Sequence, residues 1–557
     1  MSIDLTGHSF SRHGCSLSIH NRPHDDGDLI LLNHHSGGAE QEVMRLQAQR
    51  SGAVCPLTFS AGIGSYIGLC DGAEALRIAL AAPGLMRIEG LGLDLRLALP
   101  EAAALTLAPE GRRCIIINRP SCRRRYAVVC HHGSITIDDQ AGLALGAADD
   151  GRLACTVEEH SSTWIPAGPC DQQTLARQSK ASYDAFRAPF QVADDSELAD
   201  RAVYTLWSTV MPAHGCFTRP AILPTLDSLP QITGWESCFT AMALAGAHDR
   251  LAWDQYLLPF DHQDTHGCLP WAVMIHDRRF DACPPPIHGW TVAHLLAHSS
   301  PEVWTPLLPE IYQGLALWTL WWLNHRRRSG QRLAHYALAL ESGWSASSTF
   351  DQGVPLVSPD LAALLICQCD VLRTLARRLA RHQDALQWRT SAETLSNALI
   401  GDLWNGRRFA SALLTADGPE ALRDDSLQGC LPVILAGRLP GPVRNGVVAD
   451  TARFITGRLL ASQAPGSATY DPGHLWRGAV HPQAVALISQ GLAACGQRER
   501  AQAITGSLLD CCRTHGLAPA FAADDGRALS TGSHAISAAV YLDILRGRLP
   551  GHGPRPS

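Results

Sequence analysis

The chain of 557 residues lacks features that would place it in several other protein classes. Basic residues do not exceed acidic ones, at 46 against 52, which argues against a general nucleic-acid or anionic-membrane binder. No stretch reaches the roughly eighteen apolar residues in a row that a membrane-spanning helix needs. The opening segment MSIDLTGHSFSRHG lacks the apolar core of a secretory signal peptide. We therefore expect a cytoplasmic protein without a nucleic-acid or membrane partner.

Metal-binding and disulfide patterns are also missing. The 18 cysteines are scattered, and the close pairs Cys367/Cys369 and Cys511/Cys512 do not have the CxxC spacing. The 25 histidines form no HExxH pattern. We predict that most cysteines are free and act as small core residues, and that the protein holds no metal and no cofactor.

The composition permits a large core, because 46% of the residues are hydrophobic and 18% are charged. Aromatic residues make up only 6%, yet 14 of them are tryptophans. A single tryptophan is most often a core residue whose N–H finds a partner. Several tryptophans here adjoin charged residues in predicted loops or at helix starts, so as a group they indicate a polar, aromatic-lined pocket.

The pattern changes near residue 170. Before it, short apolar or alternating runs are separated by turn signals, which is typical of a β-sandwich. The clearest runs are Leu29–Leu32, Leu91–Leu99, Cys114–Ile117, Tyr126–Cys130 and Ser134–Ile137. We predict an N-terminal antiparallel β-sandwich domain over residues 1–170 and a linker helix over 171–194.

From about residue 195 the apolar spacing is three and four, as in amphipathic helices. The predicted helices are Glu197–Met211, Trp235–Ala247, Pro309–Arg328, Pro359–Arg381, Gln383–Asn405, Pro442–Leu460, Val480–Cys495, Glu499–Thr514 and His534–Arg546. Helices of this length, joined by loops and without a fixed-period repeat, favour a helical toroid over a solenoid. We predict a toroid over residues 195–548 and a C-terminal tail over 549–557.

Seven motifs follow one another in the helical part: GWESCF (234–239), HGCLPW (266–271), CPPPIHGW (283–290), ESGWSASSTFD (341–351), SPDLAALL (358–365), HLWRGAVHPQAV (474–485) and GSHAISAAVYLDIL (532–545). Their order and spacing resemble six-hairpin glycosidases, such as trehalases, the processing α-glucosidase I family and mannosylglycerate hydrolase-like enzymes. This resemblance covers roughly two-thirds of the chain. It implies an (α/α)6 barrel, which in these families often follows a β-sandwich.

Inverting glycoside hydrolysis needs two carboxyl groups about 6.5–9.5 Å apart, one as general acid and one as general base. The resembling families take their acid from the Asp of ESGWD, and Ser345 stands at that position here. Their base is a Glu in the loop before the last helix, which falls here on Ala523 or Asp524. The usual acid is therefore absent, because a serine hydroxyl is a poor proton donor.

A relocated acid–base pair is one interpretation of this difference. The candidate catalytic residues are Glu341, Asp351, Asp524 and Asp525, although Glu341 could be purely structural and each of the others could be an ordinary loop carboxylate. The expected ligand-binding residues are Trp235, Glu236, Trp271, Trp344, Ser345, Trp476 and Arg477. The expected partner is a small carbohydrate, and the oligomeric state stays open.

Two further interpretations use the same pocket. The protein could be a non-hydrolytic sugar-modifying enzyme (an isomerase, lyase or transferase), because function is a property of the site rather than of the fold. It could also be a carbohydrate-binding pseudoenzyme. A different class, a helical toroid that binds peptides or prenyl groups beside a metal, would require a metal site whose spacing does not appear in the sequence.

Overall fold

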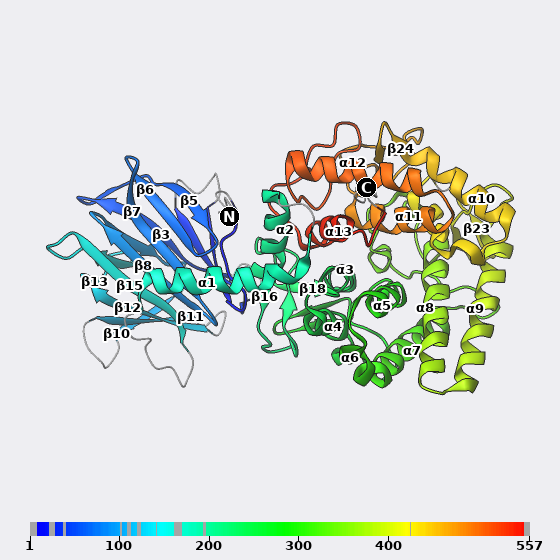
Figure 1. Cartoon of the computed structure of the whole chain (residues 1–557), viewed down its shortest axis with the longest axis horizontal. Helices are drawn as coiled ribbons and strands as arrows, with labels where there is room; N and C mark the ends of the chain where they lie inside the picture. Colours follow the sequence, from blue (N-terminus) through cyan, green and yellow to red (C-terminus); the bar gives the residue numbers. More distant parts are fainter. Residues whose placement is uncertain are drawn as a thin grey trace. The chain divides into compact units, whose positions relative to one another are not determined.

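The structure is a computed structural model, shown in Figure 1. It describes residues 8–21, 28–36, 41–100, 103–107, 113–119, 124–140, 142–160, 170–192, 196–423 and 425–550. The predicted boundary at residues 194 and 195, and residues 551–557 of the predicted tail, lie outside these ranges. The chain forms two compact units: the first comprises Met1–Ala188, Val203–Gln231 and Met274–His276, and the second comprises Pro189–Ala202, Ile232–Val273 and Asp277–Ser557.

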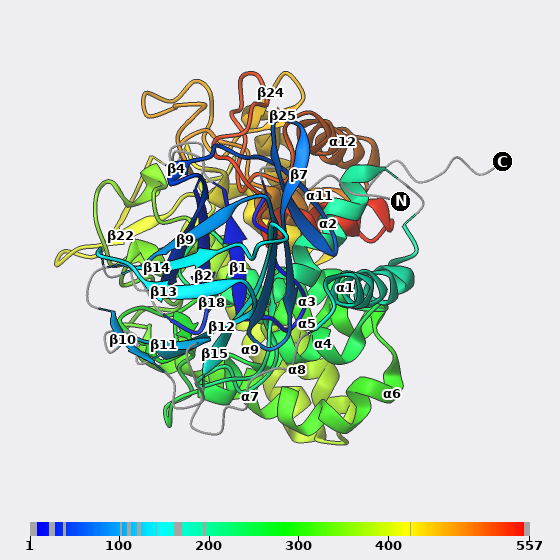
Figure 2. The same ribbon diagram turned by 90° about the vertical axis from the view of Figure 1, so that its left-hand side faces the viewer.

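The first unit is built on two antiparallel sheets, whose strands are blue to cyan in Figures 1 and 2. One sheet has the order β1-β2-β3-β9-β14-β13, with β4 paired to β3, and the other has the order β10-β11-β12-β15-β8-β7-β6-β5. The strands of the first sheet are β1 Leu17–His20, β2 Leu29–Asn33, β3 Glu42–Arg50, β4 Ala53–Val54, β9 Asp94–Ala98, β13 Ser134–Ile137 and β14 Leu143–Gly146. Those of the second are β5 Thr58–Gly62, β6 Ser65–Cys70, β7 Ala73–Ala81, β8 Leu85–Leu91, β10 Ala104–Leu107, β11 Cys114–Arg119, β12 Arg124–His132 and β15 Arg152–His160.

Strand β9 shows why these segments form sheets with one apolar face. Leu95 and Leu97 are buried, while Arg96 between them points to the opposite face, where its Nε lies 2.7 Å from Asp138 Oδ2. This alternation has the period of a strand. The two sheets contact each other, and their contact includes a buried hydrogen bond of 2.8 Å from Asn33 Nδ2 to Tyr126 OH.

Helix α1, Gln172–Arg187, belongs to the first unit and packs on β7. It begins at the cap residue Asp171, whose carboxylate accepts a hydrogen bond from Thr174 N. Its large apolar side chains Leu175, Tyr183 and Phe186 recur along one side and are buried. This amphipathic pattern accounts for a helix at the position predicted for the linker.

The second unit is helical, so the prediction of antiparallel strands followed by helices is confirmed. Six segments contact one another in a closed cyclic order: α3 Gly234–Leu244, α5 His288–His298, α8 Pro359–Arg378, the 3₁₀ segment η7 Leu427–Arg438, α11 Pro482–Ala494 and α13 Ala535–Leu545, which returns to α3. Five further helices pack against members of this ring: α4 Asp249–Leu257, α7 Leu308–His325, α9 His382–Leu403, α10 Gly441–Asp450 and α12 Arg498–His515.

The remaining elements are short. The helix α2, Glu197–Ser208, is divided between the units, and α6 is Pro301–Trp304. The short strands are β16 Val210–Met211, β17 Ala221–Ile222, β18 Gln231–Thr233, β19 Ala272–Met274, β20 Arg278–Arg279, β21 Leu356–Val357, β22 Ala412–Leu414, β23 Pro419–Ala421, β24 Ile455–Thr456 and β25 Leu459–Leu460. The short 3₁₀ segments are η2 Ala188–Phe190, η3 Phe260–His262, η4 Thr305–Leu307, η5 Ala339–Ser342, η6 Ser348–Phe350 and η8 Thr451–Phe454.

The long connections of the second unit carry most of the predicted site residues. Each of them leads into the N-terminus of a ring segment, whereas the connections that leave the ring segments are short. The ring helix α13 is buried along nearly its whole length, because neighbours cover it on all sides.

One predicted helix, Pro442–Leu460, is wrong in its second half. The helix α10 ends at Asp450, and the chain continues through η8 into the hairpin β24–β25, in which Ile455 pairs with Leu460. Gly457 lies in the turn with φ of 60°, a conformation that glycine adopts without strain. No helix in the described part of the chain is long and apolar enough to cross a membrane.

Candidate functional site

Glu341 holds the ESGW loop in place from inside. Its side chain is fully buried, and one carboxylate oxygen accepts hydrogen bonds from Ala337 N at 2.7 Å and Leu338 N at 3.3 Å. The other oxygen is paired with Arg326. With both oxygens occupied by the protein, Glu341 is a positioning residue for the loop.

Gly343 brings this loop against Trp235 at the start of α3. A Cβ at position 343 would lie 1.5 Å from the indole Nε1 of Trp235, so only glycine fits there. Trp235 is itself buried and stacks on Phe239 with a ring separation of 5.7 Å. The first and fourth motifs are therefore in direct contact.

Trp344 and Trp476 lie together, although 131 residues separate them in the sequence. Their ring centroids are 4.4 Å apart, and His481 stacks on Trp476 at 3.6 Å. The backbone N–H of Trp476, which has a positive φ of 61°, donates to His481 Nε2 at 3.0 Å. Burial lowers the pKa of His481 to about 3, so its ring stays neutral and can accept this bond.

Both tryptophans are nearly covered, with exposed fractions of 1% for Trp344 and 8% for Trp476. They form an aromatic floor under the neighbouring polar groups, and they do not present open ring faces in this conformation. Ser345, which follows Trp344 directly, is exposed.

Asp351 and Arg477 form a bidentate ion pair beside this floor. Arg477 Nη1 lies 2.9 Å from Asp351 Oδ2, and Nη2 lies 2.5 Å from Oδ1. The hydrogen bonds to Asp351 raise the pKa of Arg477 above its ordinary value. Asp351 keeps an exposed fraction of 41%, so a ligand can reach it, but both of its oxygens are directed at the guanidinium.

Asp524 and Asp525 lie on the turn before the last ring helix. They are about half exposed and face Arg527, whose Nη1 is 3.1 Å from Asp525 Oδ2. The backbone N–H of Arg527 lowers the pKa of Asp525. The neighbouring Ala523 is buried and donates from its N–H to Pro472 O at 3.0 Å, which places this turn beside the loop that carries Trp476.

Two of the residues predicted to bind the ligand, Glu236 and Trp271, contact near neighbours in the sequence. Glu236 accepts from the Thr233 N–H and hydroxyl and so caps α3, while burial raises its pKa. Trp271 is half-buried, with the guanidinium of Arg279 lying 4.7 Å from its ring centroid. Both residues have local structural roles that a sequence motif does not distinguish from ligand binding.

The sequence of the helical part of the chain matches a known protein family. The family model of the mannosylglycerate hydrolase MGH1-like glycoside hydrolase domain matches residues 229–537, which is more than half of the chain. The protein belongs to this family. The match covers the ring segments from α3 to α11 with their loops and ends within the first turn of α13, and it confirms the predicted resemblance to six-hairpin glycosidases.

Glycosidases of known structure have folds similar to that of this chain. GH63 mannosylglycerate hydrolase from Thermus thermophilus, in complex with glucose, is 19% identical and has a TM-score of 0.54, over 62% of this chain and 99% of that one. A bacterial glucoamylase complexed with acarbose is 9% identical and has a TM-score of 0.60, over 97% of this chain and 93% of that one. At these identities the likeness shows the fold alone. No curated protein sequence matches the chain.

Within this MGH1-like domain the structure shows a buried acid that the sequence reasoning did not select. Asp360, in the first turn of α8, is fully buried, and its Oδ2 accepts from Tyr336 OH at 3.0 Å and from Gln428 Nε2 at 3.3 Å. Burial raises its pKa. The sequence signal for this residue was an Asp in the first turn of a helix that is apolar over its next residues. A carboxylate at this end of a helix is stabilised by the helix dipole.

Serine hydroxyls connect the ESGW loop of this domain to its neighbours. Ser347 Oγ donates to Ser426 Oγ at 2.9 Å, and Ser348 Oγ donates to Gln463 Oε1 at 2.8 Å. The ESGW loop is thus linked directly to the loops that carry Ser426 and Gln463. In the described ranges, no three His, Cys, Asp or Glu side chains are grouped so as to hold a metal ion.

Proposed function

We propose that the protein is a carbohydrate-active enzyme of the glycoside hydrolase type that acts on a small glycoside or oligosaccharide. The helical unit is then an (α/α)6 toroid, and its ligand pocket lies among the loops that precede the ring segments. The observation that carries this proposal is the contact between Trp344 and Trp476, each of which adjoins a polar residue of the site: the exposed Ser345 follows Trp344, and Arg477, paired with Asp351, follows Trp476.

The acid–base pair of this enzyme is non-standard. Asp351 is the first candidate for the acid, because it is exposed, adjoins the aromatic floor and would be released if a ligand hydroxyl or carboxylate took its place on Arg477. Asp524 and Asp525 are the candidates for the base, since their turn adjoins the loop of Trp476. Trp235, Glu236 and Trp271 complete the proposed pocket.

A second candidate function is non-hydrolytic sugar chemistry or sugar binding. Ser345 at the acid position, together with an Asp351 whose two oxygens both face Arg477, favours it. In this case the pocket retains affinity without a proton donor.

The first test concerns hydrolysis. Because one related structure is that of a mannosylglycerate hydrolase, mannosylglycerate and simple α-glucosides are the substrates to assay first. If Asp351 is the acid, Asp351→Asn lowers kcat/KM by at least about a hundredfold, the lower end of what general acid catalysis contributes. If the wild type is inactive because it lacks an acid, Ser345→Asp is expected to produce measurable hydrolysis.

Asp402→Asn is the matched control, because Asp402 is also an exposed carboxylate in an ion pair, with Arg332, but lies at the end of the outer helix α9. It should leave the rate unchanged. Full activity of Asp351→Asn would remove Asp351 from the mechanism. If neither the wild type nor Ser345→Asp cleaves a glycoside while sugars still raise the melting temperature, the second candidate function is the correct one.

A further inference from the structure

Two cysteines of the first unit, Cys55 and Cys70, lie against each other although 15 positions separate them in the sequence. Their Sγ atoms are 2.9 Å apart, and both are free thiols in this structure. A disulfide bond is about 2.05 Å long, so the two sulfurs need to approach by only roughly 0.9 Å to form one.

The backbone holds each of these cysteines in place. The N–H of Cys55 donates to Ala48 O at 2.8 Å, which extends the pairing of β4 with β3. Cys70 is the last residue of β6 and is paired with Ala73, the first residue of β7. The two residues between them both have positive φ, as in a type I′ hairpin turn. The fold therefore brings the two sulfurs together from two different sheets.

Solvent reaches this pair on the side of Cys55. Cys55 is half-buried, whereas Cys70 has an exposed fraction of 5%. Cys70 Sγ also lies 3.6 Å from Oδ2 of Asp71, whose side chain is largely exposed. The hydrogen bond with Cys55 raises the pKa of Cys70 to about 11, so Cys70 keeps its proton near neutral pH. Cys55 is therefore the sulfur that meets an oxidant first, and Cys70 is the one that reacts second.

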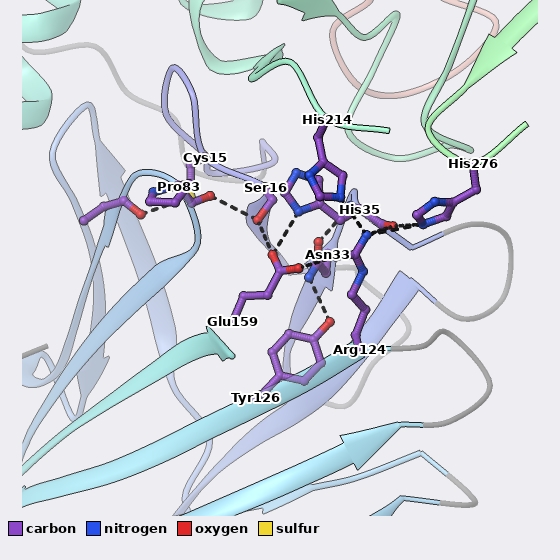
Figure 3. A network of polar contacts seen from close by, with 11 residues as sticks. Cys15, Ser16, Asn33, His35, Pro83, Arg124, Tyr126, Glu159, His214 and His276 are labelled. Atoms are coloured by element: carbon purple, nitrogen blue, oxygen red, sulfur yellow. Dashed lines mark hydrogen bonds and ion pairs between the residues drawn. The ribbon is translucent and has the colours of Figure 1, made fainter. Parts of the chain in front are cut away.

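Cys15 is the contrasting cysteine of the same unit. Its side chain is fully buried, and its Sγ donates to Ala81 O at 3.5 Å (Figure 3). Burial raises the pKa of Cys15 to about 12. Because the thiolate is the form that attacks a disulfide, a buried thiol of this kind is inert. Cys15 is thus an internal control for any oxidation of the folded protein.

We propose that Cys55 and Cys70 are a reversible disulfide site whose oxidant is a low-molecular-weight disulfide of the glutathione type. The Cys55 thiolate attacks one sulfur of the oxidant and forms a mixed disulfide, and the other half leaves as a thiolate that takes up the proton lost by Cys55. Cys70 then loses its proton, its sulfur attacks Cys55 Sγ, and the second half of the oxidant leaves with that proton as a thiol. Two protein thiols are oxidised and one oxidant disulfide is reduced to two thiols.

This bond joins the two sheets at one edge of the first unit. Cys55 follows β4 of the first sheet, Cys70 ends β6 of the second, and the strand between them, β5, is the edge strand of the second sheet. An edge strand presents unpaired backbone groups, so it is a place where a sheet opens or pairs wrongly. The disulfide restricts β5 from both ends. The site does not depend on the carbohydrate function proposed above.

Differential alkylation of the full-length protein tests the proposal. Trypsin releases residues 51–77 as one peptide that contains Cys55, Cys70 and no other cysteine. The native protein is equilibrated with glutathione disulfide, unfolded and treated with iodoacetamide. We expect this peptide to take up no alkyl group and to be lighter than the reduced peptide by two hydrogen atoms, and dithiothreitol to restore both thiols. Cys15, the only cysteine in the peptide 13–45, should stay fully alkylated.

Two single variants test the order of the reaction. Cys70→Ser lacks the second sulfur and is expected to retain a glutathione adduct on Cys55. Cys55→Ser is expected to stay unmodified at Cys70. A stable adduct on Cys70 in Cys55→Ser, with none on Cys55 in Cys70→Ser, would contradict the proposed order.

Oxidation is also expected to raise the melting temperature of the first unit, by roughly 5–10 °C, because the bond closes a loop of about 15 residues in the unfolded chain. Both variants should lose this rise. Cys170→Ser is the matched control, since it replaces a half-buried cysteine of the same unit, and it should keep the rise.

The proposal is wrong if the peptide 51–77 of the oxidised wild type still carries two alkylatable thiols, if Cys15 is oxidised to the same extent, or if the rise in melting temperature persists in Cys55→Ser. The alkylation is measured on the wild type, so it decides the question even where a variant does not fold.

Discussion

Gly343 packs directly against Trp235 of α3 only because it has no side chain. With φ of 74° and the Trp235 indole 1.5 Å from where a Cβ would lie, an alanine here is both strained and overpacked. We expect Gly343→Ala to lower the free energy of unfolding by about 3 kcal/mol, which combines a left-handed backbone penalty with overpacking. Scanning calorimetry of the variant measures the corresponding fall in the melting temperature of the helical unit.

The variant Gly330→Ala separates the backbone penalty from the overpacking. Gly330 has a similar φ of 80°, but nothing lies within 4 Å of where its Cβ would be. It should therefore lose only the backbone term, about 1 kcal/mol. Equal losses for the two variants would contradict the close packing of Gly343 on Trp235.

The sequence located the candidate site residues better than it described their roles. The motifs marked the ESGW and WRG loops, and the structure places Trp344 against Trp476. The motifs do not show that Glu341 is buried by its own loop or that Asp351 is paired with Arg477. Burial and pairing depend on the folded surroundings of each side chain, such as an arginine more than a hundred positions away from Asp351, which a local pattern does not contain.

Among the secondary-structure elements, α13 carries a buried acid that couples stability to pH. Burial raises the pKa of Asp543 to about 6, and burial also lowers that of His294, whose Nε2 is 3.9 Å from Asp543 Oδ2. This geometry alone would suggest an ion pair, but full burial favours the neutral form of both groups. The positive charge of Arg548, whose Nη1 is 3.8 Å from Asp543 Oδ1, lowers the pKa of Asp543, but by less than burial raises it.

Because the pKa of Asp543 is higher in the folded state than the unfolded value near 3.8, protonation stabilises the fold. This contribution is complete below about pH 4 and is lost as the pH rises to about 6. Two pKa units correspond to about 3 kcal/mol. We expect Asp543→Asn to flatten the pH dependence of the melting temperature between pH 4 and 6.

Asp510→Asn provides the comparison, because Asp510 is an exposed carboxylate on α12 with an exposed fraction of 68%. Its replacement should leave the slope between pH 4 and 6 as in the wild type. An unchanged slope in Asp543→Asn would show that Asp543 is ionised throughout this range.

The elements themselves were predictable to different degrees. Amphipathic periodicity over many residues predicted α8, α9 and α12 close to their observed bounds. The same periodicity continued beyond α10, where the chain in fact forms the hairpin β24–β25. Apolar residues at Ile455 and Leu460 fit either structure, and the pairing of the two strands decides between them.

At the scale of the whole molecule, the first unit is assembled from separate stretches of the chain. Residues 203–231 belong to it, and Tyr204 contributes a buried hydroxyl that donates to Ser11 O at 3.1 Å. Trp207 Nε1 donates to Ser182 Oγ at 3.3 Å, and Gly14 N donates to Val210 O at 2.9 Å. A fragment that ends at residue 188 lacks the partners that residues 203–231 supply.

We therefore expect a fragment of residues 1–231 to unfold cooperatively at a clearly higher temperature than a fragment of residues 1–188. Burying a large apolar side chain such as Trp207 contributes about 1.5–3 kcal/mol, and several such residues are lost together. Near-UV circular dichroism during heating measures both transitions. Indistinguishable melting curves would show that residues 203–231 do not stabilise this unit.

The order of strands before helices and the family were predictable from the sequence, because composition, periodicity and motif order extend over hundreds of residues. The assignment of residues 203–231 to the first unit was not. Tyr204 and Trp207 lie in an amphipathic helical stretch that resembles those of the second unit, and only their contacts with Ser11 and Ser182 distinguish them.

The contact of α13 with α3 also affects how the chain folds during synthesis. Roughly three hundred residues separate these two helices, so the loop that closes the ring is among the longest in the protein. On a ribosome that adds about 5–20 residues per second, α13 is synthesised at least about 15 seconds after α3. Until then one side of α3, which is buried along nearly its whole length in the finished ring, is exposed to solvent and to chaperones.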